Sequence, residues 1–189
     1  MKGTIMLPSA GIDGTIAVYA KAPNKMLTQT RSGVLGNSRT GFDGTTAWEE
    51  KDGEVKDLAI FPVREADFYL PINLRELYPR VELKGKQKIG ARAVYVLEAP
   101  RGGNPKDWYF DAETGLLLRT EARDSEGNIR RREDYDDYRA IDGVRIPLTV
   151  RRIDENQTQI IIKFSEVKHN VPIDDAKFDK PTRQRAGGP

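Results

Sequence analysis

The stretch from residue 108 to residue 152 constrains the fold more than any other part of the chain. Three turn sequences, DAETG, DSEGN and IDG, separate runs in which residues of opposite character alternate. In the first run Leu118 is expected to share a face with Leu116, opposite Leu117. Between 144 and 151 the apolar residues occupy every second position. This period of two with Asx-Gly turns is typical of an antiparallel meander with one buried face.

The same alternation predicts strands outside the meander. One of them, 91–99, is apolar on both faces, with Val94 and Val96 on one and Tyr95 and Leu97 on the other. A strand buried on both sides implies a layer above it and a layer below it. The other strands are expected at 2–7, 15–21, 25–32, 36–42, 45–50, 81–89 and 158–169.

Residues 57–78 are the only part of the chain whose pattern favours helices. Pro71 must end or kink a first piece that follows Pro62, because proline cannot donate to the helical ladder. Asn73 can cap a second short piece, and Pro79 stops it. Neither piece is long enough to be stable alone, so both are expected to dock on an apolar surface.

These elements predict a mainly β (α+β) fold. A large antiparallel sheet of about ten or eleven strands is expected to curl into a half-barrel, because sheets of this size curl or close. The broken helix of residues 60–78 would form a short lid on the concave face. A closed, lipocalin-like barrel is the alternative. One domain is expected over residues 1–181, followed by a disordered tail at 182–189.

Composition excludes several classes of function. The chain has 189 residues, 31 lysines and arginines against 29 acids, and no cysteine. The nearly balanced, dispersed charge argues against nucleic acid as a partner. Without cysteine there is no thiol catalysis, disulfide or thiolate zinc site. No apolar run approaches the ~18 residues of a transmembrane helix. No signal peptide is visible, and the abrupt start inside a strand indicates a chain trimmed at its N-terminus.

No set of residues predicts catalysis, a metal site or a cofactor. The sole histidine, His169, lies three residues from Glu166, which on a strand means the opposite face. The acids between 133 and 137 are interleaved with arginines, so cross-strand ion pairs explain them. Asp174 is expected to cap a helix start, although weak calcium binding there or at 133–137 is an alternative. Nucleotide-binding glycine motifs are absent, and the protein is predicted not to be an enzyme.

Five segments of the sequence resemble those of a known family. The motifs are WYFDAETGLLLR at 108–119, EDYDDYRAIDGVRIP at 133–147, FDGTTAW at 42–48, READFY at 64–69 and FSEVKHNVPIDDAKF at 164–178. They resemble the bacterial outer-membrane lipoprotein-sorting proteins, the LolA/LolB-like superfamily, and more specifically its uncharacterised members. The resemblance covers nearly the whole chain.

The resemblance implies a periplasmic binding or carrier protein for an acyl chain, a lipoprotein or another hydrophobic ligand. The ligand would lie between the curled sheet and the helical lid. The alternative is a non-enzymatic extracytoplasmic interaction or lipid-sensing module of a larger exported protein, with a protein partner recruited by an edge strand, for which the charged run 128–139 is the candidate. The residues expected to line the apolar cavity are Trp48, Phe68, Tyr69, Leu74, Leu77, Tyr95, Leu97, Leu118, Ile146 and Leu148.

Overall fold

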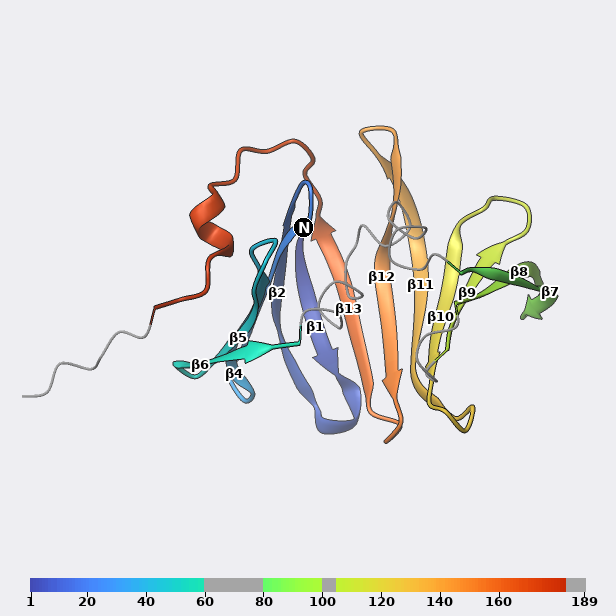
Figure 1. Ribbon diagram of the computed structural model, residues 1–189, viewed down its shortest axis with the longest axis horizontal. Helices are drawn as coiled ribbons and strands as arrows, with labels where there is room; N and C mark the ends of the chain where they lie inside the picture. Colours follow the sequence, from blue (N-terminus) through green and yellow to red (C-terminus); the bar gives the residue numbers. More distant parts are fainter. Residues whose placement is uncertain (60–79, 100–104, 183–189) are drawn as a thin grey trace, which may run out of the picture. The chain divides into compact units, whose positions relative to one another are not determined.

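A computed structural model describes residues 1–59, 80–99 and 105–182 (Figure 1). Within these residues the chain is almost entirely β, and its only helices are two short 3-10 turns. The elements are β1 (Lys2–Leu7), η1 (Pro8–Ala10), β2 (Ile12–Lys21), β3 (Lys25–Ser32), β4 (Gly36–Phe42), β5 (Ala47–Lys51), β6 (Glu54–Leu58), β7 (Glu82–Ile89), β8 (Arg92–Ala99), β9 (Lys106–Asp111), β10 (Leu117–Arg123), β11 (Ile129–Ile141), β12 (Val144–Asp154), β13 (Gln159–Glu166) and η2 (Asp175–Phe178).

The described strands form one hydrogen-bonded antiparallel sheet. Their order is β6-β5-β4-β3-β2-β1-β13-β12-β11-β10-β9-β8-β7, so most strands lie beside their neighbours in sequence. Because β6 and β7 each have a single neighbour in this order, the sheet is open and the alternative of a closed barrel is wrong. The expected half-barrel of ten or eleven strands is corrected to an open sheet of thirteen, a size that open sheets do reach.

Two predictions about the elements need correction. Asp57 and Leu58 were expected in the helical region but belong to β6, a polar strand that pairs with β5 and that the sequence analysis missed. The rest of that region, including the helical lid, lies outside the described residues. The run 128–139 is not an edge, because β11 pairs with β10 on one side and β12 on the other.

The chain divides into two compact units, and each is described by itself. Within the described residues one contains 1–5, 12–59 and 164–182, and the other contains 6–11, 80–99 and 105–163. The prediction of one domain over 1–181 stays a prediction, and all but the first residue of the expected tail at 182–189 lies outside the described residues.

The first unit is built on the meander β2–β6. Register pairs Tyr19 with Leu27, Leu27 with Gly41 and Gly41 with Trp48, so these four residues share one face. A Cβ atom on Gly41 would lie 2.3 Å from Cζ2 of Trp48. Glycine is therefore the residue that lets the indole lie flat across β4.

The C-terminal segment packs on this same face. The indole of Trp48 and the side chain of Leu27 are fully buried together with Phe178 of η2. Ile173 packs against this cluster. Phe178 and Ile173 thus return to the sheet, whereas Val171 remains 44% exposed.

The second unit carries the meander β9–β12 with the hairpin β7–β8 beside it. The antiparallel pairs β8–β9, β9–β10, β10–β11 and β11–β12 confirm the strands and turns predicted for 108–152. A bulge interrupts the alternation of β10 between Leu117 and Arg119. Leu118 therefore lies on the same side as Tyr109, with which it packs. Strand β8 was predicted to be buried on both faces, but only one face is. Val94 and Val96 are buried, whereas Tyr95 on the other face is 37% exposed.

Candidate functional site

Cross-strand register gathers a continuous row of side chains on one face of the second unit. Leu97 lies opposite Trp108, and Trp108 lies opposite Thr120. Thr120 lies opposite Glu133, which in turn lies opposite Arg152. Directly paired residues point to the same side of a sheet. We call this side the Trp108 face.

Most of the Trp108 face is apolar and buried. Val150 lies between Tyr135 and Ile162 in register, and Leu148 follows two positions along β12, on the same side. Val150, Ile162 and Leu148 are at most 9% exposed, and Trp108 is 1% exposed. Burial of side chains of this size stabilises the unit, because apolar area removed from water is the main favourable term in folding.

Glu133 places a charge within this apolar surface. Its carboxylate accepts hydrogen bonds from Nε of Arg152 at 2.7 Å and from the hydroxyl of Tyr135 at 2.9 Å. Nε of Arg131 lies 3.9 Å from the same carboxylate. Burial alone would raise the pKa of Glu133, but Arg152 and Arg131 outweigh it and the pKa is lowered. The group is an ionised, paired carboxylate and not a proton donor.

The opposite side of the second unit is a packed core, which we call the Tyr109 face. Val94, Val96, Tyr109 and Leu118 form one buried cluster, and Ile89 packs against it. Leu118 was expected to line a ligand cavity together with Leu148. The bulge in β10 instead places it in this cluster, on the side opposite Trp108.

A second carboxylate, Glu121, is buried on the Tyr109 face. It accepts hydrogen bonds from the Tyr109 hydroxyl at 2.9 Å, from Nη2 of Arg123 at 2.7 Å and from Nε of Arg132 at 3.0 Å. Burial, with the hydrogen bond to Glu121, raises the pKa of Tyr109 to about 12. Three donors occupy this carboxylate, so it has the arrangement of a structural ion cluster rather than of a catalytic base.

Asp107 borders the same cluster and is less well satisfied. Its Oδ2 accepts a hydrogen bond from Nε of Arg123 at 3.0 Å, while its buried Oδ1 has no hydrogen-bond partner in the described chain. Burial raises the pKa of Asp107, and Arg123 offsets only part of that shift. The free buried oxygen agrees with this direction, because burial without a hydrogen-bond donor disfavours the charged form of a carboxyl group.

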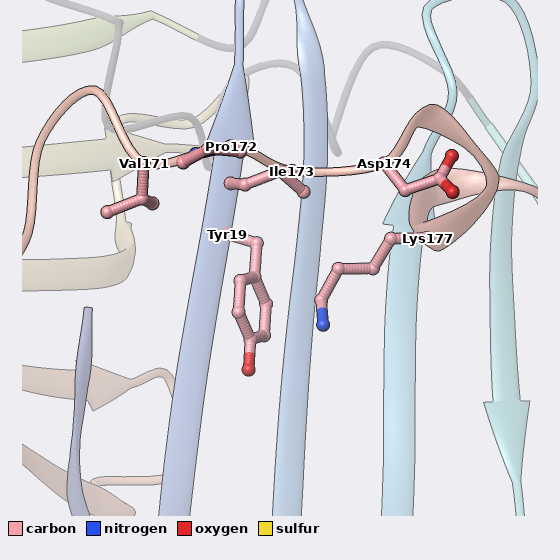
Figure 2. A pocket seen from close by; sticks show the side chains of 6 residues that line it. All are labelled: Tyr19, Val171, Pro172, Ile173, Asp174 and Lys177. Atoms are coloured by element: carbon pink, nitrogen blue, oxygen red, sulfur yellow. The ribbon is translucent and has the colours of Figure 1, made fainter.

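The first unit contains a shallow pocket between strand β2 and the C-terminal segment (Figure 2). Its volume is about 310 Å³. Nζ of Lys177 lies 3.9 Å from the centroid of the Tyr19 ring, a cation–π contact that Figure 2 shows from the side. The mixture of charged and apolar walls differs from the apolar lining expected of an acyl-chain site. The lining residues are Tyr19, Val171, Pro172, Ile173, Asp174 and Lys177.

The structure brings some of the predicted lining residues together and separates others. Tyr95 and Leu97 alternate with the buried valines of β8, so both belong to the Trp108 face, as do Ile146 and Leu148. Trp48 belongs to the first unit, where its indole N–H donates to the main-chain oxygen of Phe178. The remaining four, Phe68, Tyr69, Leu74 and Leu77, lie outside the described residues.

The cross-strand ion pairs and the helix cap predicted for charged residues occur in the structure. Acids of β11 do form cross-strand ion pairs, among them Asp134 with Arg119 at 2.6 Å and Glu133 with Arg152. Asp174 does cap η2, because its Oδ1 accepts from the main-chain nitrogen of Ala176. No group of three or more potential metal-ligating side chains occurs within residues 1–59, 80–99 and 105–182.

Glu133 and Leu83 also belong to the Trp108 face, although neither was predicted there. The signal for Glu133 was available, since it alternates with Tyr135 along β11. The position of Leu83 depends on a bulge at β7, which the residue pattern does not reveal. Among the described helices, none has the length and hydrophobicity needed to cross a membrane.

Comparison with known proteins yields a fold. No family model matches the sequence, and no curated protein matches it. A LolA superfamily protein from Nitrosomonas europaea is similar in structure, with a TM-score of 0.68 and 13% identity over 95% of this chain and 89% of that one. A domain assigned to outer membrane lipoprotein sorting, from Vibrio parahaemolyticus, has a TM-score of 0.67 and 12% identity over 94% and 87%.

A DUF1329 family protein from Desulfovibrio piger is also similar, with a TM-score of 0.62 and 15% identity over 94% of this chain and 87% of that one. All three similarities extend over nearly the full chain, as the sequence motifs implied. Together they show that this chain has the fold of LolA-superfamily and lipoprotein-sorting proteins.

Proposed function

We propose that the protein is a periplasmic, non-enzymatic carrier that binds an acyl chain, a lipoprotein or another hydrophobic ligand on the Trp108 face. The observation that carries the proposal is the LolA-like fold over nearly the whole chain. The Trp108 face supports it, because binding sites for apolar ligands are mostly apolar with a few placed polar groups. Glu133 and Arg152 are such polar groups.

Ligand access is proposed at the β8 end of the Trp108 face. Trp108 is 1% exposed, so the centre of the face is closed, whereas Tyr95 on β8 is 37% exposed and Leu97 is half-buried. An acyl chain would enter beside these two side chains and extend along the row toward Leu148. Of the predicted lining residues, Tyr95, Leu97, Ile146 and Leu148 are the proposed contacts.

Native mass spectrometry of the purified full chain, followed by lipid extraction, tests the proposal. Co-purifying lipid, or displacement of a fluorescent fatty-acid probe, is the expected result. The Leu97→Asn variant is expected to weaken probe binding because it places an amide on the Trp108 face. Ile89→Asn is the matched control, since Ile89 is also half-buried but packs on the Tyr109 face. No lipid and no probe binding, or equal loss in both folded variants, would overturn the proposal.

A second candidate is an interaction or lipid-sensing module, and the tip of the β3–β4 hairpin favours it. Val34 and Leu35 are 73% and 46% exposed there. The Ser32 hydroxyl accepts hydrogen bonds from both main-chain nitrogens at 3.3 Å, which fixes the tip. Capture of a periplasmic protein by the native chain but not by a Val34→Asn, Leu35→Asn variant would favour this function over the carrier.

A further inference from the structure

The outer hairpin β7–β8 has two chemically different faces. Register pairs Leu83 with Leu97, and Lys86 with Tyr95, so these side chains belong to the Trp108 face. Lys88 follows two positions after Lys86 and shares that side. We call Leu83, Lys86, Lys88 and Tyr95 the outer-hairpin patch.

The outer-hairpin patch combines exposed apolar surface with positive charge. Leu83 is 62% exposed and Tyr95 is 37% exposed, whereas the other apolar residues of β8 are buried or half-buried apart from Ala93. Lys86 and Lys88 are both exposed. Nζ of Lys86 lies 4.9 Å from the centroid of the Tyr95 ring. Neither lysine forms an ion pair within the described part of the chain.

Acidic side chains of the hairpin lie on the other side. Glu82 and Glu98 oppose each other on the Tyr109 face, and Nζ of Lys84 pairs with Glu98 at 2.9 Å. Arg92, paired in register with Ile89, also lies on this side. Within β7 and β8 the Tyr109 face therefore carries two acids and two basic residues, whereas the charges of the outer-hairpin patch are both positive. This separation gives one side of the hairpin a net attraction for anions.

We propose that the outer-hairpin patch docks the protein on the surface of an anionic lipid bilayer. Lysines attract anionic headgroups while their aliphatic stems, the leucine and the tyrosine contact the interfacial region. The role of this docking rests on the carrier function proposed above, because docking at the patch brings the open end of the Trp108 face to the lipid.

Strand addition by a peptide is the less favourable use of this edge. Edge strands that carry lysines and a bulge are protected against pairing with another strand. Strand β7 has both features, because the register shifts between Leu83 and Gly85. The chemistry of the edge therefore lies in its side chains rather than in its open backbone groups.

Co-sedimentation of the full chain with vesicles tests this docking. Binding is expected to vesicles of phosphatidylcholine with phosphatidylglycerol and not to phosphatidylcholine alone. It should weaken strongly near 1 M salt, where the Debye length is about 3 Å. Inorganic phosphate at matched ionic strength should not compete, because a bilayer and not a free anion is the proposed partner.

Variants on the two sides of the same strand separate docking from net charge. Lys86→Gln and Lys88→Gln are each expected to weaken vesicle binding about fivefold, and Leu83→Asn to weaken it further. Lys84→Gln removes the same charge from the opposite side and is expected to change binding less than twofold, compared with about fivefold for each lysine of the patch.

Three results would overturn the docking proposal. They are equal binding to neutral vesicles, no binding to anionic vesicles, and an effect of Lys84→Gln as large as that of Lys86→Gln. If lipid still co-purifies with a chain that fails to bind vesicles, the carrier function stands and only the docking surface falls. If the chain binds vesicles but neither co-purifies with lipid nor binds the probe, the docking surface stands and the carrier function falls.

Discussion

The indole N–H of Trp48 donates a 3.0 Å hydrogen bond to the main-chain oxygen of Phe178, across a sequence separation of 130 residues. Both side chains are fully buried. Contacts of such range fix the C-terminal segment to strands β3–β5. The ion pair of Lys180 with Asp57 on β6, at 2.7 Å, extends the attachment.

Truncation of Phe178 should therefore release the segment. Phe178→Ala removes a buried ring from the cluster with Leu27 and Trp48, and such changes cost roughly 3–5 kcal/mol of unfolding free energy. Denaturation followed by tryptophan fluorescence measures the loss. Val171→Ala, in the same segment but 44% exposed, should stay within about 0.5 kcal/mol of the native chain. Similar losses in both variants would contradict the anchoring role of Phe178.

The close approach of Trp48 to β4 predicts a contrast between two glycines. In Gly41→Ala the new methyl group would lie 2.3 Å from the indole ring, so the core must shift at a cost of about 1–3 kcal/mol. Gly33→Ala meets nothing within 4 Å and should be neutral or slightly stabilising. Thermal unfolding of the two variants checks this, and equal melting temperatures would refute the packing described for Trp48.

Glu133 should make stability depend on pH at the acid end. Its pKa is lowered in the folded chain, so the stability it provides is present above its unfolded pKa of about 4.3 and is lost as pH falls through the folded value. Glu133→Gln should cost about 1–3 kcal/mol at neutral pH. The difference between native chain and variant should shrink below about pH 4. A difference that stays constant with pH would contradict the pairing with Arg152.

Asp107 should have the opposite pH dependence. Its pKa is raised by burial, so the folded chain holds the proton more tightly than the unfolded chain. Stability should therefore fall as pH rises above the unfolded pKa of about 3.9 and through the raised value. Asp107→Asn removes this dependence, and the variant should gain on the native chain between acidic and neutral pH in urea denaturation. If the variant instead lost stability relative to the native chain over this pH range, both carboxylate oxygens of Asp107 would have hydrogen-bond partners.

Local pattern predicted the strands well because alternation and turn chemistry are local properties. The β3 and β4 strands begin and end where the sequence indicated, at 25–32 and 36–42. Asp-Gly turns such as Asp142-Gly143 separate the strands of the meander, and Gly143 has a φ of 80° that favours glycine. The family resemblance added the fold, which alternation alone does not specify.

Non-local features of the sheet were not predictable in the same way. Whether a charged strand is central or at an edge depends on its partners, and β11 is central because its acids meet Arg119 and Arg152 on neighbouring strands. Strand β6 was missed because its sequence, EVKDL, is too polar to show a buried face. The lining residues were chosen by alternation, which failed at Leu118, where a bulge intervenes.

The bulge at β7 has a further consequence for how this surface can change. Strict alternation along ELKGKQKI would align Lys84 with Lys86 and Lys88 and place Leu83 on the reverse side. The single additional residue instead exchanges Leu83 for Lys84. Loss of the bulge with every residue kept, by a one-residue slip of the start of β7 against β8, would thus convert this side of β7 from amphipathic to purely basic. The amphipathic character of this surface therefore depends on the bulge as much as on the residues that the strand carries.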